Sequence, residues 1–208
     1  MIRASSFLAG LAALAAFTAL VLQAVLIVQT MREGGASTGA ALWRFFGYFT
    51  ILTNIVVMVV AGAMAVGGRL ASARVKLCAF TAIVAVGLVY SLALRAMWNP
   101  TGWQAVADHA LHDASPLLFV AAWLTGAHGG LVWRDIAAAL VFPFAYFVYA
   151  IARGLADGWY AYWFLDPTEL GWGGMAASIV VLLCVFALVA AMGVALDRQL
   201  GRARRAAV

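Results

Sequence analysis

The chain has 208 residues, of which 66% are hydrophobic and 10% are charged, and its net charge is +5. A soluble domain carries about 25% charged residues, so this composition excludes an ordinary water-exposed surface and makes lipid the solvent for most of the chain. The cations form short clusters beside apolar segments, a pattern typical of membrane topology, and we expect no nucleic-acid partner. Cys78 and Cys184 lie inside apolar stretches, which indicates neither a disulfide framework nor a thiolate metal site.

Six apolar segments are long enough to cross a membrane, because a helix needs about 20 apolar residues to span the hydrocarbon layer. Charges, glycines or prolines bound them, and the short connections leave no room for a soluble domain. The sequence therefore predicts one all-α domain over residues 1–208, an integral membrane protein with six transmembrane helices. The predicted spans are residues 5–28, 43–66, 75–98, 111–130, 136–152 and 173–196.

The distribution of lysine and arginine predicts the orientation. If the N-terminus is cytoplasmic, nine cations fall on that side: Arg3, Arg69, Arg74, Lys76, Arg134, Arg198, Arg202, Arg204 and Arg205. Four fall on the other side: Arg32, Arg44, Arg95 and Arg153. The positive-inside rule thus places both termini in the cytoplasm. Abundant alanine, glycine and arginine indicate a bacterial coding bias, so we expect a multi-pass protein of the bacterial inner membrane.

Polar side chains are costly at membrane depth, so each one marks a candidate functional position. The second span carries Thr50, Thr53 and Asn54. A threonine in a membrane helix is most often structural, because its hydroxyl bonds a carbonyl one turn earlier. The alternative is a nucleophile, which needs a neighbouring base to take its proton. Asn54, one turn below Thr50, is either an interhelical hydrogen-bonding residue or a donor to an oxyanion.

A cluster of histidine and aspartate stands at the start of the fourth span, in Asp108-His109-Ala110-Leu111-His112-Asp113. His112 lies at a depth comparable with that of Thr50, toward the outer leaflet, and is the candidate general base. Asp108, four residues earlier, either orients the imidazole or caps the helix. A metal site needs a third ligand, and His128 lies about 24 Å further down the same helix, so we expect no metal and no cofactor.

Two arginines, Arg95 and Arg153, lie near the outer ends of the third and fifth spans. They either pair with acidic residues and snorkel to the interface, or bind a carboxylate head group. The candidate substrate-binding residues are therefore Asn54, Arg95, Asp113 and Arg153.

An aromatic run occupies the connection before the sixth span. It reads Trp159-Tyr160-Ala161-Tyr162-Trp163-Phe164 and precedes Leu165-Asp166-Pro167. Such a run is either an anchor in the membrane interface or a lid over a cavity.

Three short motifs occur in order along the chain: Tyr48-Phe49-Thr50-Ile51-Leu52-Thr53-Asn54, His109-Ala110-Leu111-His112 and Tyr162-Trp163-Phe164-Leu165-Asp166. With them the sequence resembles the androgen-induced protein family and its bacterial six-helix relatives. The resemblance implies an integral-membrane threonine hydrolase of fatty acid esters of hydroxy fatty acids, with the threonine at Thr50 and the histidine at His112. Thr53 is a second candidate nucleophile, because the residues around Thr50 depart from the shorter motif of the animal members.

The hypothesis that combines these observations is a membrane-embedded hydrolase that cleaves a fatty-acyl ester arriving from the bilayer. Thr50 attacks the ester and His112 is its base. The alternative is a small transporter or lipid-binding protein without hydrolytic activity, with Arg95, Asp113 and Arg153 along a polar pathway. The apolar stretch that follows Asn54 favours a blind pocket over a channel. A haem protein would need two irons and further ligands, since no other helix offers a histidine.

Overall fold

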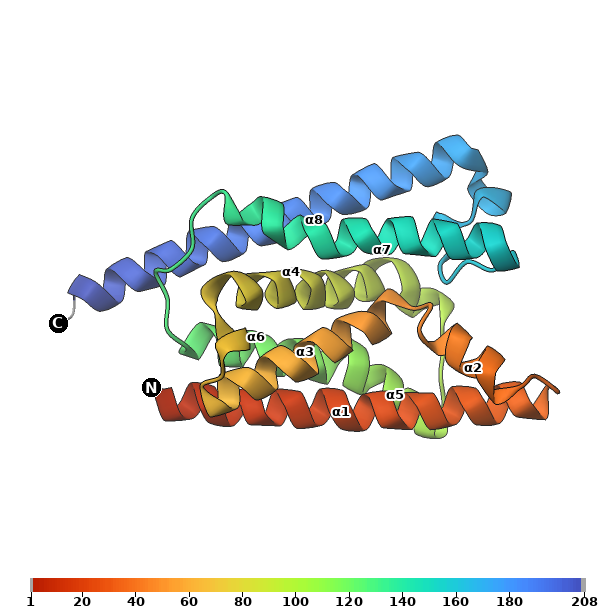
Figure 1. Cartoon of the computed structure of the whole chain (residues 1–208), viewed down its shortest axis with the longest axis horizontal. Helices are drawn as coiled ribbons and strands as arrows, with labels where there is room; N and C mark the ends of the chain where they lie inside the picture. The colour runs from red at the N-terminus through yellow and green to blue at the C-terminus, as the bar shows by residue number, and fades with distance from the viewer. Residues whose placement is uncertain (1, 207–208) are drawn as a thin grey trace.

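The computed structural model describes residues 2–206, and this part of the chain folds into helices with no strand (Figure 1). Five of its helical segments are long and apolar enough to cross a membrane, which makes the chain an all-α, multi-pass membrane protein. These segments are α1 (Ile2–Glu33), α3 (Phe49–Val66), α4 (Ala73–Val89) with its continuation to Met97, α7 (Asp135–Asp157) and α8 (Pro167–Ala206).

The expected fourth span, 111–130, is built from shorter pieces. α5 (Gly102–His109) continues through the π-helical segment η4 (Ala110–Ala114) into α6 (Ser115–Thr125). Residues 126–130 are not helical, so this run of helix ends five residues earlier than predicted. The three pieces together run from one end of the bundle to the other, beside α1 and α3 (Figure 1).

The expected second span, 43–66, is two helices rather than one. α2 (Thr38–Phe45) ends two residues before Gly47, and α3 begins at Phe49. Gly47 packs so closely that a Cβ atom there would lie 2.6 Å from both Arg153 Nη1 and the Trp159 ring. Thr50 therefore lies in the first turn of α3, and not within one continuous helix that begins at Trp43.

α1 packs on the rest of the bundle through small side chains. Ala9, Ala12, Ala16 and Ala19 are almost fully buried and share one face of the helix. Small residues let membrane helices approach closely, which matters where lipid is as apolar as the helix surface. The exposed Phe7 on the same helix is suited to contact with lipid.

The start of α1 and the end of α8 lie at the same end of the bundle, which we call the terminal end (Figure 1). The opposite end, called the loop end, holds α2, the connection before α5 and the loop 158–166. The loop between α6 and α7 is fastened at the terminal end. Asp197 of α8 accepts a hydrogen bond from the Leu131 backbone at 2.9 Å and lies 3.2 Å from His128 Nδ1.

Candidate active site

Thr50 and His112 meet near the loop end of the bundle. Thr50 Oγ1 lies 3.3 Å from His112 Nε2, although the residues are 62 positions apart. α3 supplies the threonine and η4 supplies the histidine. At this distance the imidazole is within reach of the hydroxyl proton.

The other nitrogen of His112 determines the tautomer of the ring. Nδ1 lies 3.0 Å from the backbone oxygen of Asp108 and 3.2 Å from its carboxylate Oδ1. Both oxygens only accept hydrogen bonds, so Nδ1 carries the proton. In the neutral ring Nε2 then presents its lone pair to the Thr50 hydroxyl, which is the arrangement that a general base requires.

Asp108 is the third member of this arrangement. The sequence leaves it open whether Asp108 orients the histidine or caps a helix. The residue in the N-cap position of α5 is Thr101, while Asp108 lies in the last turn with only 4% of its surface exposed. Asp108 therefore orients His112 and does not cap the helix.

Tyr90, which the sequence analysis did not select, completes the support of the histidine. Its ring stacks on the His112 ring with centroids 3.9 Å apart and planes inclined by 13°. Its hydroxyl donates a hydrogen bond to Asp108 Oδ2. Tyr90 begins a second π-helical segment, η2 (Tyr90–Leu94), and π turns are frequent at functional sites.

The π turn of η4 explains the position of Asn54. In this turn the Ser115 amide donates to the carbonyl of Ala110, five residues earlier, and not to that of Leu111. Pro116, the next residue, has no N–H to donate. The carbonyl of Leu111 therefore has no helical donor. Asn54 Nδ2 donates to that carbonyl at 3.3 Å and to the Thr50 carbonyl at 2.9 Å. The amide hydrogens of Asn54 thus already bond two backbone oxygens, and its contact with substrate or an oxyanion stays a prediction.

Thr53, the second candidate nucleophile, lies away from this arrangement. Its side chain is fully buried, and Oγ1 has no hydrogen-bond partner among residues 2–206. The structure thus places Thr50, and not Thr53, beside His112.

Arg95 and Asp113 form an ion pair at the surface of the loop end. His109 Nδ1 lies 2.7 Å from the same carboxylate. Neither Arg95 nor Asp113 lines a cavity next to Thr50, and their role in substrate binding stays a prediction.

Arg153 is also held by other side chains. Its guanidinium lies over the Trp43 ring at 4.0 Å, and Nη1 donates to the Tyr149 hydroxyl at 3.1 Å. Its side chain is 5% exposed and lines neither cavity at Thr50. Arg153 therefore fastens α7 to α2, and its contact with a substrate carboxylate stays a prediction.

A cavity of about 290 Å³ opens at Thr50 and His112. Its walls come from α1, the turn before α3, η2 with the segment after it, α5, η4 and the loop 158–166. Gln23 and Gln104 lie at its side, where Gln104 Nε2 donates to Gln23 Oε1 at 2.8 Å. The volume is close to that of ordinary small-molecule sites, which begin at about 300 Å³.

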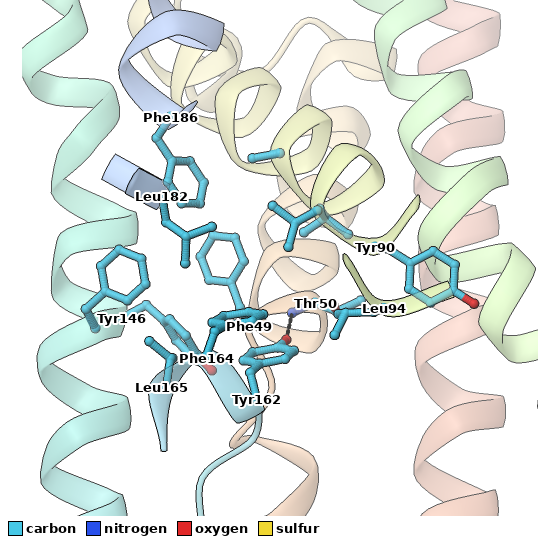
Figure 2. A pocket seen from close by; sticks show the side chains of 14 residues that line it. Phe49, Thr50, Tyr90, Leu94, Tyr146, Tyr162, Phe164, Leu165, Leu182 and Phe186 are labelled. Atoms are coloured by element: carbon cyan, nitrogen blue, oxygen red, sulfur yellow. Dashed lines mark hydrogen bonds between the residues drawn. The ribbon is translucent and has the colours of Figure 1, made fainter. Parts of the chain in front are cut away.

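A smaller recess of about 40 Å³ also borders Thr50 (Figure 2). It shares Thr50, Tyr90, Leu94 and Tyr162 with the cavity, and its other walls are hydrocarbon and aromatic side chains. Leu182 and Phe186 of α8 supply part of its wall (Figure 2). His112 lines the cavity but not the recess.

The aromatic loop 158–166 supplies one wall of the site. The Tyr162 hydroxyl accepts a hydrogen bond from the Thr50 amide at 3.4 Å and so caps α3, whose N-cap residue Tyr48 makes no such bond (Figure 2). Burial raises the pKa of Tyr162, so the phenol keeps its proton. Asp166 ends the loop by capping α8, with Oδ1 2.8 Å from the Thr168 amide.

Within residues 2–206 there is no group of three or more histidine, cysteine, aspartate or glutamate side chains that could hold a metal ion.

Comparison with known protein families, with curated proteins and with solved structures found no match to this chain. The chemistry of the site therefore has to be argued from its own geometry.

Proposed function

We propose that the protein is a membrane-embedded hydrolase of lipidic carboxylic esters, with Thr50 as nucleophile, His112 as general base and acid, and Asp108 as the group that orients His112. The observation that carries the proposal is the 3.3 Å contact between Thr50 Oγ1 and His112 Nε2, in an imidazole whose other nitrogen faces Asp108. A threonine hydroxyl attacks only when a base removes its proton, and this arrangement provides one.

The reaction has two steps. In the first, His112 Nε2 takes the Thr50 proton as Oγ1 bonds to the carbonyl carbon of the ester. The bond from that carbon to the alcohol oxygen then breaks, and the leaving alcohol takes the proton from Nε2. In the second step, water attacks the acyl-threonine and gives a proton to Nε2. The carboxylic acid leaves as Thr50 Oγ1 regains that proton.

Two features near Thr50 favour the negative charge of the tetrahedral intermediates. Thr50 lies in the first turn of α3, where backbone N–H groups lack helical acceptors and the helix dipole is positive. The protonated Tyr162 hydroxyl lies beside it and is a hydrogen-bond donor. We therefore assign the oxyanion to Tyr162 and the α3 N-terminus, in place of Asn54.

We further infer six passes from the apolar segments and a bacterial inner membrane from the abundant alanine, glycine and arginine. Because lysine and arginine concentrate at the terminal end, we assign that end to the cytoplasm and the cavity to the outer leaflet. Trp98 and Trp163 line the cavity, and tryptophan prefers the level of the lipid head groups. A lipid ester would reach the site from the bilayer beside them.

The test is covalent labelling of the purified protein with a fluorophosphonate probe, which reacts with activated hydroxyl nucleophiles. Wild-type protein should be labelled, while Thr50→Val and His112→Ala should not. The matched control is Thr53→Val, which removes a second threonine hydroxyl of α3 outside both cavities and should keep the labelling. Labelling of Thr50→Val at the wild-type rate rejects the proposal.

A further inference from the structure

The two hollows that meet at Thr50 differ in the catalytic groups that reach them. Thr50, His112 and Asp108 all line the cavity of about 290 Å³. The recess of about 40 Å³ contains Thr50 but neither of the other two residues. The nucleophile thus stands at the junction, with its base on one side only.

This asymmetry determines how an ester lies in the site. The leaving alcohol oxygen must take its proton from His112 Nε2, so it departs on the side of Thr50 that faces the cavity. The acyl carbons stay bonded to Thr50 in the intermediate and extend away from the leaving group. The acyl chain therefore points into the recess, and the alcohol half of the ester occupies the cavity.

The two volumes then limit the size of each half. A water-sized group needs about 10–15 Å³ of cavity measured in this way. The recess of about 40 Å³ holds roughly three or four such groups, and the cavity of about 290 Å³ holds roughly twenty. Leu182 and Phe186 of α8 line the recess, whose small volume leaves little room for a longer acyl chain.

The lining of each hollow agrees with this assignment. Apart from a few hydroxyl groups, the recess presents hydrocarbon and aromatic atoms, which suit a methylene chain. The cavity carries Gln23 and Gln104, whose amides can make further hydrogen bonds beyond the one that joins them. Polar atoms in the alcohol half would find partners there.

We infer that the substrate is a short-chain acyl ester, with about four acyl carbons, of a larger amphiphilic alcohol. The long hydrocarbon chain of the lipid belongs to the alcohol half, which leaves the cavity toward the bilayer. This inference rests on the proposed hydrolase function.

A pair of isomeric esters tests the inference on the full chain in detergent micelles. Hexadecyl butanoate and butyl hexadecanoate have the same atoms and the same ester group, and differ only in which half is long. We expect kcat/KM at least tenfold higher for hexadecyl butanoate when the two compete in the same micelles. An equal rate, or a preference for butyl hexadecanoate, overturns the inference.

A variant of the recess provides the second measurement. Leu182→Ala should lengthen the recess and raise the ratio of octanoate to butanoate hydrolysis several-fold, with hexadecyl as the common alcohol. Val89→Ala is the replacement if Leu182→Ala does not fold, since Val89 also lines the recess. The control is Leu188→Ala on the same helix, because Leu188 is 70% exposed and lines neither hollow. An unchanged ratio in a folded recess variant overturns the assignment.

The outcomes separate this inference from the proposed function. If the probe labels Thr50 but neither ester is hydrolysed, the substrate assignment is wrong and the nucleophile assignment stands. If Thr50 is not labelled either, the proposed function is wrong and the substrate assignment is lost with it.

Discussion

Asp108→Asn tests how the site prepares His112. In the transition state the ring is an imidazolium, and its Nδ1 lies 3.2 Å from the Asp108 carboxylate. At an effective dielectric constant of about 20, two unit charges at that distance attract by about 5 kcal/mol. The backbone carbonyl of residue 108 lies 3.0 Å from Nδ1 and is untouched by the substitution, so it still holds the proton on Nδ1.

The variant therefore loses the charge of Asp108 but keeps the tautomer of His112. We expect kcat to fall about 10³-fold, which corresponds to about 4 kcal/mol, rather than the roughly 10⁴-fold loss seen where the carboxylate alone fixes the tautomer. The assay is ester hydrolysis together with the rate of probe labelling. Asp113→Asn is the matched control, since Asp113 pairs with Arg95 outside the cavity and its loss should leave both rates within twofold. A fall of less than tenfold in folded Asp108→Asn refutes the role of the carboxylate.

Three further predictions concern the surroundings of the site. Tyr162→Phe removes an oxyanion donor and should lower kcat about 10²-fold with little change in KM, which steady-state kinetics would show; an unchanged kcat excludes the donor role. Asn54→Leu leaves a buried carbonyl without a donor and should cost about 1–3 kcal/mol, visible as a lower Tm in detergent, whereas an unchanged Tm would contradict the bonding described for its amide. Gly154→Ala would place a Cβ atom 2.0 Å from the Tyr160 ring and should lower Tm, while Gly62→Ala, with nothing within 4 Å, should not; equal Tm values would show that this contact is unimportant.

Hydropathy and segment length were sufficient to predict most of the membrane helices, because lipid requires long apolar segments whatever the fold. The break between α2 and α3 could not be read in this way. At the break, Gly47 packs closely against Arg153 and Trp159, which follow it by more than a hundred positions. A contact between distant segments leaves no mark in the local pattern of apolar residues.

Thr50 and His112 were selected because polar side chains are rare and costly at membrane depth. The sequence does not single out Tyr90, because an aromatic residue in an apolar segment is usually a packing residue. Its role depends on the stack with the His112 ring, which a distant helical segment supplies. Pro116 has no backbone N–H, so the sequence alone indicates that a carbonyl about one turn earlier lacks its helical donor. That Asn54 supplies the replacement donor depends on how two passes pack together, which the sequence alone does not give.

If Thr50 is the nucleophile proposed above, the start of α3 also determines what can reach its hydroxyl. α3 has 18 residues and is about 27 Å long, close to the roughly 30 Å thickness of the hydrocarbon layer. Its first turn consequently lies where hydrocarbon gives way to hydrated head groups. Hydrolysis of a lipid ester needs the lipid, which is insoluble in water, and water, which the hydrocarbon layer excludes. Both are present at this boundary. A threonine two turns deeper would form the acyl-threonine and keep it, because no water would be present to hydrolyse it.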